Sequence, residues 1–382
     1  MSKVRLGVIG VGGMGKFHVG NIQKARDVQL TAVCDIVRER ADEVAASQKC
    51  AAYSDHKELI RAGVCDAVMI VTPHYAHTTI GIDMLKAGLH VLVEKPISVH
   101  KADCERLIAA HKNRKQVFAA MFNQRTDPHY GALRSLIQQG QLGKLDRVTW
   151  VITDWFRSEA YYASGGWRAT WAGEGGGVLL NQCPHNLDLW QWMFGMPDHV
   201  RAFCHIGRKH NIEVEDEVTA VLEYDNGCMG TFITSTGEAP GTNRLEVAGE
   251  HGKVVVEGGE VRFTRNTVSA NEFLKTTPES FARPEVWNCQ IPVSGNGGQH
   301  MEVLQNFIDA IASGCPLIAP AAEGIRSVEL GNAMLYSSET GKTVDLPLNG
   351  SAYERMLKQK IRDSRFIKRT RQVKTTGMKG SF

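Results

Sequence analysis

The chain has 382 residues, of which 43% are hydrophobic and 22% are charged, a composition typical of a globular protein with more than one domain. It contains no apolar run of about 18 residues and no signal-peptide pattern, so neither a membrane span nor contact with a membrane is expected. Nine cysteines without a C-x-x-C pair argue against a disulfide framework or structural zinc site and favour a cytoplasmic location.

The net charge of +3 is unevenly distributed, because residues 353–382 carry ten Lys or Arg and two Asp or Glu. We expect this basic C-terminal tail, residues 351–382 and including Lys374, to be solvated or to pack on a neighbouring subunit. Nucleic-acid binding is not expected, since no recognition motif and no interleaved aromatic residues accompany the charge.

The first predicted element is a buried strand over residues 4–9, followed by a glycine-rich turn and a helix over 16–24. The turn has the pattern G-x-G-x-x-G between a strand and a helix, the setting in which it binds a dinucleotide pyrophosphate. The predicted cofactor contacts in this turn are Gly10, Gly12, Gly13, Met14 and Gly15.

A second strand over residues 29–35 ends in Asp35, about 20 residues after the turn. A carboxylate at this position can accept the adenosine ribose hydroxyls and would repel a 2′-phosphate, so it favours NAD over NADP. Arg38 lies close enough in sequence to soften that preference. The alternative for Asp35 is an ordinary helix N-cap.

Strands and helices continue to alternate, with strands over 66–71, 90–93 and 116–121 and helices between them. This alternation predicts a parallel, doubly wound sheet in a domain spanning residues 1–124, with ligands at the carboxyl ends of its strands. Further predicted cofactor contacts fall at such ends: Thr72, Pro73, His74, His77, Glu94, Lys95 and Asn123.

The composition changes beyond residue 124. A helix over 130–139, a strand over 145–155 and a helix over 178–194 precede hairpins such as the one turning at 225–227, and helices return at 301–312 and 323–340. Residues 125–350 are therefore predicted to form an α+β domain with a large, mostly antiparallel sheet whose helices lie on one face. We expect the open face to join subunits into a homodimer or homotetramer.

These motifs together resemble the Gfo/Idh/MocA family of NAD(P)-dependent oxidoreductases. The resemblance rests on the glycine turn, Asp35, Thr72-Pro73-x-x-x-His77, Glu94-Lys95-Pro96 and Gly175-Gly176-Gly177 followed by His185 and Asp188. It implies that Lys95 is the family's catalytic lysine and that His185 is the histidine of its D-x-x-x-H motif. The aspartate of that motif is Asn181 here. Residues 167–171 and 181–185 look like a branch associated with oxidation of sugars or glycosides, including oxidation at C3 of glucosides.

Lys95 and His185 have the chemistry that hydride transfer from a secondary alcohol needs. The hydroxyl proton requires a base, for which an imidazole is suited, and the alkoxide character requires a cation. The alternatives are a surface lysine at a strand end and a satisfied histidine in the core.

The remaining candidates concern the substrate. We expect Asn123 and the neutral amide of Asn181 to hydrogen-bond it, while Asp188 either binds it or forms a helix-surface or interdomain salt bridge. His74 either touches the ribose or substrate or caps a turn. Aromatic and basic residues form a candidate sugar-binding wall, with core packing as the alternative for each: Trp155, Arg157, Tyr161, Tyr162, Trp167 and Arg168.

The sequence thus predicts an NAD-dependent dehydrogenase acting on a secondary hydroxyl of a sugar, glycoside or cyclitol. The alternatives are an enzyme that cleaves glycosides with tightly held NAD and no net redox change, and a non-catalytic NAD-binding regulator on the same fold. No clustered metal ligands are apparent, so no metal is expected.

Overall fold

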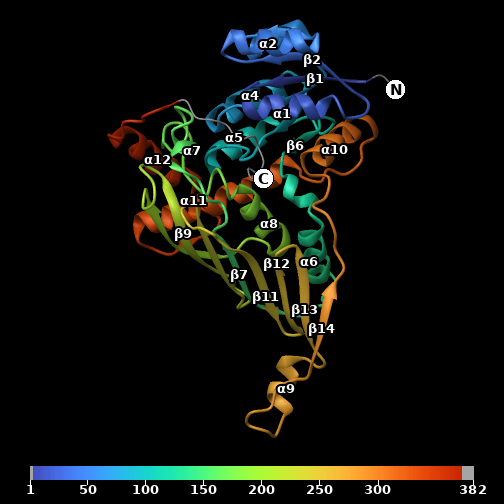
Figure 1. Ribbon diagram of the computed structural model, residues 1–382, viewed down its shortest axis with the longest axis vertical. Coiled ribbons are helices and arrows are strands. Elements are labelled where there is room, and N and C mark those ends of the chain that lie inside the picture. Colours follow the sequence, from blue (N-terminus) through green and yellow to red (C-terminus); the bar gives the residue numbers. More distant parts are fainter. Residues whose placement is uncertain (1–2, 372–382) are drawn as a thin grey trace.

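The computed structural model describes residues 3–371, and residues 4–120 form a six-stranded parallel sheet with its connecting helices (Figure 1). The strand order is β3-β2-β1-β4-β5-β6. Successive strands are added on one side of β1 as far as β3 and on its other side from β4 onwards, and dinucleotides bind at this switch point in such folds. The prediction of a doubly wound parallel sheet is confirmed. The strands are β1 (Val4–Ile9), β2 (Val28–Cys34), β3 (Ala51–Tyr53), β4 (Ala67–Ile70), β5 (His90–Val93) and β6 (Phe118–Ala120).

Helices cover both faces of this sheet and bury an apolar cluster on each. A late helix, α10 (Gln299–Ser313), adds Val303, Leu304 and Phe307 to one cluster, so residues distant in sequence complete the first domain's core. The connecting helices are α1 (Gly13–Ile22), α2 (Arg38–Gln48), α3 (His56–Ala62), α4 (His74–Lys86), α5 (Lys101–Ala110) and the short η1 (Asn123–Thr126).

The second sheet has nine strands in the order β14-β13-β12-β11-β7-β10-β9-β8-β15. All neighbouring pairs are antiparallel except β7 and β10, so the predicted mostly antiparallel sheet is confirmed. Its strands are β7 (Leu145–Ile152), β8 (His199–Ile206), β9 (Glu215–Glu223), β10 (Met229–Ser235), β11 (Asn243–Gly249), β12 (Gly252–Glu257), β13 (Glu260–Asn266), β14 (Val286–Ile291) and β15 (Val344–Asp345).

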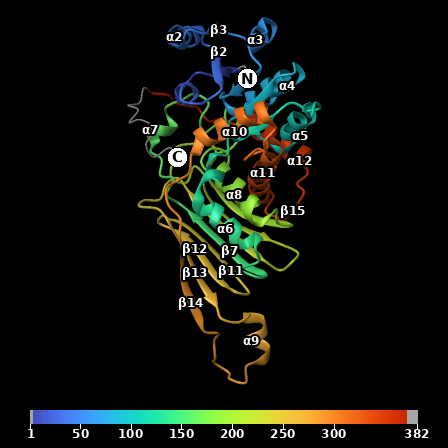
Figure 2. The same ribbon diagram turned by 90° about the vertical axis from the view of Figure 1, so that its right-hand side faces the viewer.

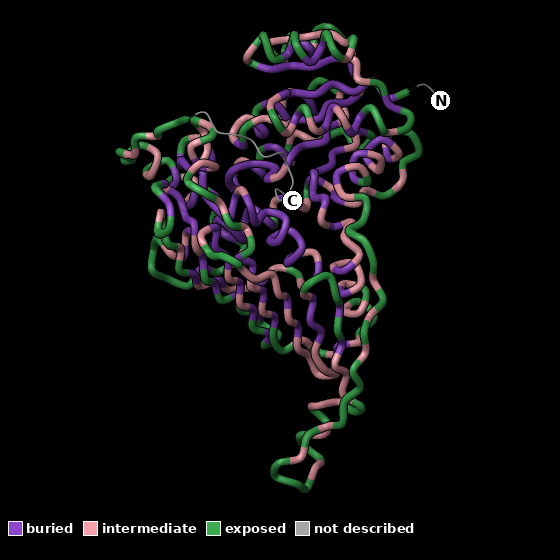
Figure 3. The backbone as a smooth tube through the Cα atoms, viewed as in Figure 1, coloured by how far each residue is buried: buried purple, intermediate pink, exposed green. Residues whose placement is uncertain are grey.

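One face of this sheet packs against α6 (Pro128–Gln138), α8 (Pro184–Phe194) and α11 (Gly324–Thr340), which lie together in front of the strands in Figure 2. The short η2 (Ala321–Glu323) precedes α11. Between β13 and β14 the chain leaves the body as an arm containing α9 (Ala270–Thr276), and Figure 3 shows that most of this arm is exposed.

The predicted helix over 178–194 is wrong at its start, because α8 begins at Pro184. The carboxylate of Glu215 accepts hydrogen bonds from the backbone N–H groups of Gly177 (2.8 Å) and Leu179 (3.0 Å), which holds this segment in turns. A Cβ on Gly177 would lie 1.9 Å from the carbonyl oxygen of Glu215. The glycine run therefore lets the chain approach β9.

The basic tail packs on its own chain over its first part. Helix α12 (Gly350–Asp363) buries Tyr353 and Leu357, because its apolar residues share one face. Residues 364–371 then cross α7 (Glu159–Tyr162), where the Lys368 ammonium donates to the Tyr162 carbonyl at 2.5 Å. This differs from the expected solvated or neighbour-bound tail, whose remainder, including Lys374, lies outside the described residues.

The proposed division at residues 124 and 350 remains a prediction. Within residues 3–371, no helix has both the length and the hydropathy to cross a membrane.

Candidate active site

The glycine turn between β1 and α1 leaves open space at its centre. A Cβ on Gly15 would lie 2.0 Å from the Gly10 carbonyl oxygen, whereas a Cβ on Gly12 or Gly13 would meet nothing within 4 Å. No side chain caps the N-terminus of α1. The backbone around Gly12, Gly13 and Met14 can therefore hold an anion at a helix N-terminus, which fits the pyrophosphate of NAD.

Asp35 is fixed beside this turn. Its carboxylate accepts hydrogen bonds from the backbone N–H groups of Val11 (3.0 Å) and Val37 (2.9 Å). Arg38 donates to Asp42 at 2.9 Å, whereas Arg40 Nη1 lies 4.0 Å from Asp35 Oδ1. Ile36 is 92% exposed and offers an apolar surface next to Asp35. The sequence analysis did not consider it as a candidate cofactor contact, although its position directly after the acid was a usable signal.

The loops after β4 and β5 are joined by His77. Its ring lies between the carbonyl oxygens of Thr72 (2.7 Å) and Pro96 (2.8 Å), so it holds these loops together. Pro73 is the N-cap residue of α4. The Thr72 hydroxyl is buried without a hydrogen-bond partner among the described residues, which leaves it available to a ligand.

His74 connects the two domains. Burial, followed by the charges of His77 and Lys95, lowers its pKa well below the ordinary value, so the ring is neutral near pH 7. Its Nδ1 donates to the Glu174 carbonyl oxygen at 3.3 Å, and its ring packs edge-on against Trp167. The ring therefore faces the second domain.

Glu94 is held by a residue that the sequence analysis missed. His18 Nε2 lies 2.6 Å from Glu94 Oε1, and both side chains are buried. Burial raises the pKa of Glu94, but the hydrogen bond and charge of His18 outweigh burial and lower it to about 2. Glu94 Oε2 accepts from the Lys95 N–H at 3.0 Å. His18 and Glu94 lie 76 residues apart in sequence, so no local sequence pattern predicts their contact.

The structure brings Lys95 to the turn that precedes α8. Lys95 Nζ donates to the Asn181 carbonyl oxygen at 2.7 Å. His185 lies in the first turn of α8 and is 6% exposed, and its Nδ1 has no hydrogen-bond partner among the described residues. Burial, followed by the charge of Lys95, lowers the pKa of His185 well below the ordinary value. The site thus combines a neutral imidazole with an amine.

The side chain of Asn181 is already engaged by the protein. Its Nδ2 donates to Glu174, and its Oδ1 accepts from the Tyr161 hydroxyl at 3.3 Å. Arg168 donates to the same hydroxyl at 2.8 Å and stacks on the Tyr161 ring with 4.7 Å between its Cζ and the ring centroid. Arg157 stacks on Tyr161 from 5.2 Å. Tyr161 is thus the centre of the candidate wall.

Two predicted substrate contacts are positioned elsewhere. Asp188 forms the salt bridge that was its alternative, since its two oxygens accept from Arg125 at 2.7 Å each. Tyr162 packs in the core, where its hydroxyl lies 2.8 Å from the Thr236 hydroxyl. Neither side chain is free to bind a sugar.

Two further candidates remain available in part. Asn123 donates to Gln299 at 2.6 Å, and its buried Oδ1 has no hydrogen-bond partner within residues 3–371. The indole Nε1 of Trp155 is likewise buried and unpartnered among the described residues. These atoms keep a hydrogen-bonding capacity that a ligand can use.

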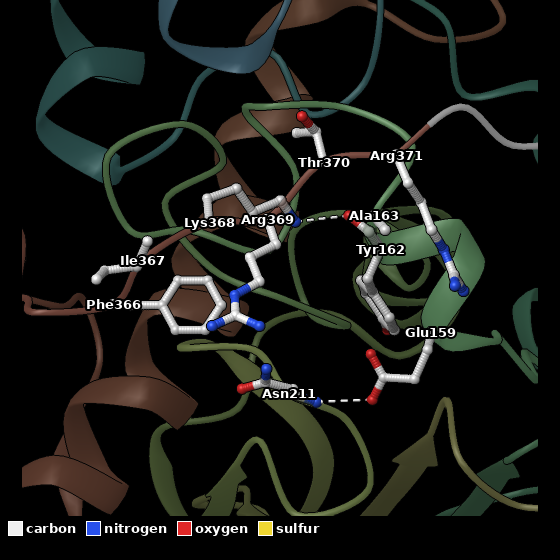
Figure 4. Close-up of a pocket in the computed structure, with 10 residues that line it drawn as sticks. All are labelled: Glu159, Tyr162, Ala163, Asn211, Phe366, Ile367, Lys368, Arg369, Thr370 and Arg371. Atoms are coloured by element: carbon white, nitrogen blue, oxygen red, sulfur yellow. Dashed lines mark hydrogen bonds between the residues drawn. The ribbon is translucent and has the colours of Figure 1, made fainter.

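A cavity of about 290 Å³ separates the C-terminal segment from α7 (Figure 4). In Figure 4 the backbone of this segment runs above α7, and a dashed line joins Lys368 to the Tyr162 carbonyl. Tyr161 belongs to α7, so the segment supports the helix that carries the candidate wall. No group of three or more potential metal ligands occurs in residues 3–371.

The parallel sheet with its glycine turn and Asp35, together with Lys95 and His185, defines an NAD-dependent oxidoreductase. Comparison with known proteins agrees. Residues 4–122 match the oxidoreductase family with an NAD-binding Rossmann fold, and residues 130–255 match the Gfo/Idh/MocA C-terminal domain. The chain belongs to the Gfo/Idh/MocA family, which confirms the resemblance seen in the sequence.

Among its relatives, myo-inositol 2-dehydrogenase of Thermotoga maritima is 26% identical over 354 residues, covering 90% of this chain and 98% of the relative. Levoglucosan dehydrogenase of Pseudarthrobacter phenanthrenivorans is 24% identical over 394 residues, covering 91% and 99%. The WlbA dehydrogenase of Bordetella pertussis, solved with NADH and UDP-GlcNAcA, superposes with a TM-score of 0.76 at 26% identity, covering 91% of this chain and all of that one.

Proposed function

We propose that the protein oxidises a secondary hydroxyl of a sugar, glycoside or cyclitol to a ketone and transfers the hydride to NAD. The observation that carries this proposal is the convergence of Lys95 and His185. Lys95 comes from the carboxyl edge of the parallel sheet, and His185 comes from the buried start of α8. Lys95 Nζ donates to the carbonyl oxygen of Asn181 at 2.7 Å, four residues before His185 in the chain.

The two side chains divide the handling of the hydroxyl proton. NAD, when bound, supplies the hydride acceptor. His185 is neutral because burial lowers its pKa, so its free nitrogen can accept the hydroxyl proton. The Lys95 ammonium donates a hydrogen bond that orients the hydroxyl oxygen and stabilises its developing negative charge.

Tyr161 and Arg168 give the site a wall suited to a sugar ring. An aromatic face packs on the C–H side of such a ring, and a guanidinium donates to its hydroxyl groups. The named relatives act on inositol and levoglucosan, which share ring secondary hydroxyls with this proposed substrate class. Oxidation at C3 of a glucoside is the narrower form of the proposal, supported by the resemblance of residues 167–171 and 181–185 to that branch.

The test is a panel of sugars, glucosides and inositols incubated with NAD or NADP, with the absorbance of reduced nicotinamide followed over time. NADH formation with at least one ring polyol is expected. Glycoside consumption without NADH accumulation, on protein that retains NAD tightly, would instead indicate redox-neutral cleavage. NAD binding without turnover of any compound would indicate a regulator.

We also propose that the open face of the nine-stranded sheet joins subunits into a homodimer or homotetramer. The exposed fractions of Phe203, Val221 and Met229 on this face are 57%, 39% and 40%, and such a patch favours protein contact. Light scattering should give a mass above the 42.1 kDa of one chain. Phe203→Glu should lower that mass, while Ile367→Glu, at an exposed position in the C-terminal segment, should not. A cytoplasmic location, supported by nine free thiols, completes the proposal.

A further inference from the structure

Glu174 is a buried acid that the proposed proton transfer does not use. It directly precedes the glycine run and is 1% exposed. Its Oε2 accepts from the Ala169 N–H at 2.6 Å, and its Oε1 accepts from Asn181 Nδ2. Burying a carboxylate is costly unless a charge or hydrogen bonds compensate it. Its position next to the candidate site is therefore informative.

The hydrogen bonds of Glu174 lead to Lys95 through one residue. Glu174 and Tyr161 hold the side chain of Asn181, and the Asn181 carbonyl oxygen accepts from Lys95 Nζ at 2.7 Å. The amide itself is neutral. The backbone carbonyl of Asn181 fixes the lysine in position, while the negative charge is that of Glu174, which contacts the Asn181 side chain.

We propose that Glu174 is a positioning residue for Lys95. The Glu174 carboxylate holds Asn181 in place and supplies part of the counter-charge of the lysine. The ammonium is thereby aimed at the substrate hydroxyl and kept protonated for that role. The role of Lys95 rests on the proposed function, but the coupling between Glu174 and Lys95 does not.

Several charged groups act on this pair. Burial raises the pKa of Glu174, and Arg168 and Lys95 lower it. Burial lowers the pKa of Lys95, and Glu94 and Glu174 raise it. Glu94 lies in the first domain and is already paired with His18. Glu174 is the carboxylate that acts on Lys95 from the second domain. The other titratable groups that interact with Glu174 or Lys95 are Lys368, Glu215, Tyr162, Cys183, His74, His77, His185 and His300.

The first experiment measures the ionisation of Lys95 without a substrate. Lys95 is partly exposed, so acetylation of the full chain across a pH series, resolved by peptide mass spectrometry, reports its titration midpoint. Glu174→Gln should lower this midpoint by about 0.5–1 pH unit, less than for a directly contacting pair because Asn181 lies between them. Glu159→Gln removes an equal charge from α7 and should leave it unchanged. An unchanged midpoint in Glu174→Gln overturns the proposal.

The second experiment tests positioning by rescue. Glu174→Gln should lower kcat about 10- to 100-fold, with the Kd for NADH within about twofold of the unsubstituted protein. The double variant Glu174→Gln with Asn181→Asp exchanges the amide and the carboxylate within the same hydrogen-bonded pair. It restores the negative charge near the lysine, so both the midpoint and most of kcat should recover. A purely structural role predicts no recovery and would refute the proposal.

The two experiments separate this inference from the proposed function. If the unsubstituted protein oxidises no compound of the panel, the proposed function fails, while the acetylation midpoint still decides the coupling. If Glu174→Gln does not fold, the double variant is compared directly with the unsubstituted protein. A lowered midpoint in that folded double variant overturns the proposal.

Discussion

Asp188→Asn should cost stability, because Asp188 belongs to a buried ion pair with Arg125, which joins α8 to η1. Arg125 and Asp188 are each 1% exposed at their side chains and meet through two hydrogen bonds of 2.7 Å. Breaking a buried pair costs about 3–5 kcal/mol, since one charge is left uncompensated. Arg125 also contacts Glu323 at 2.6 Å. Because Glu323 still compensates part of the Arg125 charge, we expect the free energy of unfolding to decrease by about 3 kcal/mol, the lower end of this range.

The loss should appear as a decrease of about 5 °C or more in Tm, measured by calorimetry. Urea unfolding at pH 7 should give the matching decrease in the free energy of unfolding. Asp345→Asn is the matched control: this side chain is 85% exposed and pairs with His199 at the surface, so less than about 1 kcal/mol is expected. An unchanged Tm together with a raised KM for the sugar would refute the salt-bridge role and restore Asp188 as a substrate contact.

Three further predictions concern the cofactor side of the site. Lys95→Ala should abolish turnover but leave NADH affinity within about twofold, as followed by NADH fluorescence; lost NADH binding would refute its assigned role. Asp35→Ser should reduce the NAD over NADP preference in kcat/KM about tenfold or more, because the carboxylate that repels a 2′-phosphate is gone; an unchanged ratio would show that other residues set it. Glu94→Gln should remove about 3 kcal/mol at neutral pH, because the folded pKa of about 2 lies below the ordinary 4.5. That contribution is present above pH 4.5 and decreases as pH falls towards 2. The difference in stability between the variant and the unsubstituted protein should therefore fall to less than half of its pH 7 value by pH 3; equal separation at pH 7 and pH 3 would contradict this.

Local patterns were sufficient to predict the parallel sheet and the glycine turn between β1 and α1. The glycine turn and Asp35 act through backbone geometry within a single β–α–β unit, so their spacing carries the information. The start of α8 was mispredicted because the apolar residues 178–180 fit a helix, while the contact that holds them in turns comes from Glu215 on a distant strand. The His18–Glu94 pair and the crossing of residues 364–371 over α7 likewise depend on tertiary contacts that periodicity does not encode.

Asn181 shows why a single position in a motif is an incomplete description of a site. An amide can donate a hydrogen bond to Glu174, whereas an aspartate at 181 could not, and two buried carboxylates in contact would have to share a proton. Glu174 and Asn181 are therefore chemically complementary, and each restricts what the other can be. Within the D-x-x-x-H pattern the missing acid looks like a loss of function. In the folded chain a carboxylate lies one hydrogen bond further away and remains electrostatically coupled to Lys95, so the departure at position 181 is compatible with the same proton chemistry.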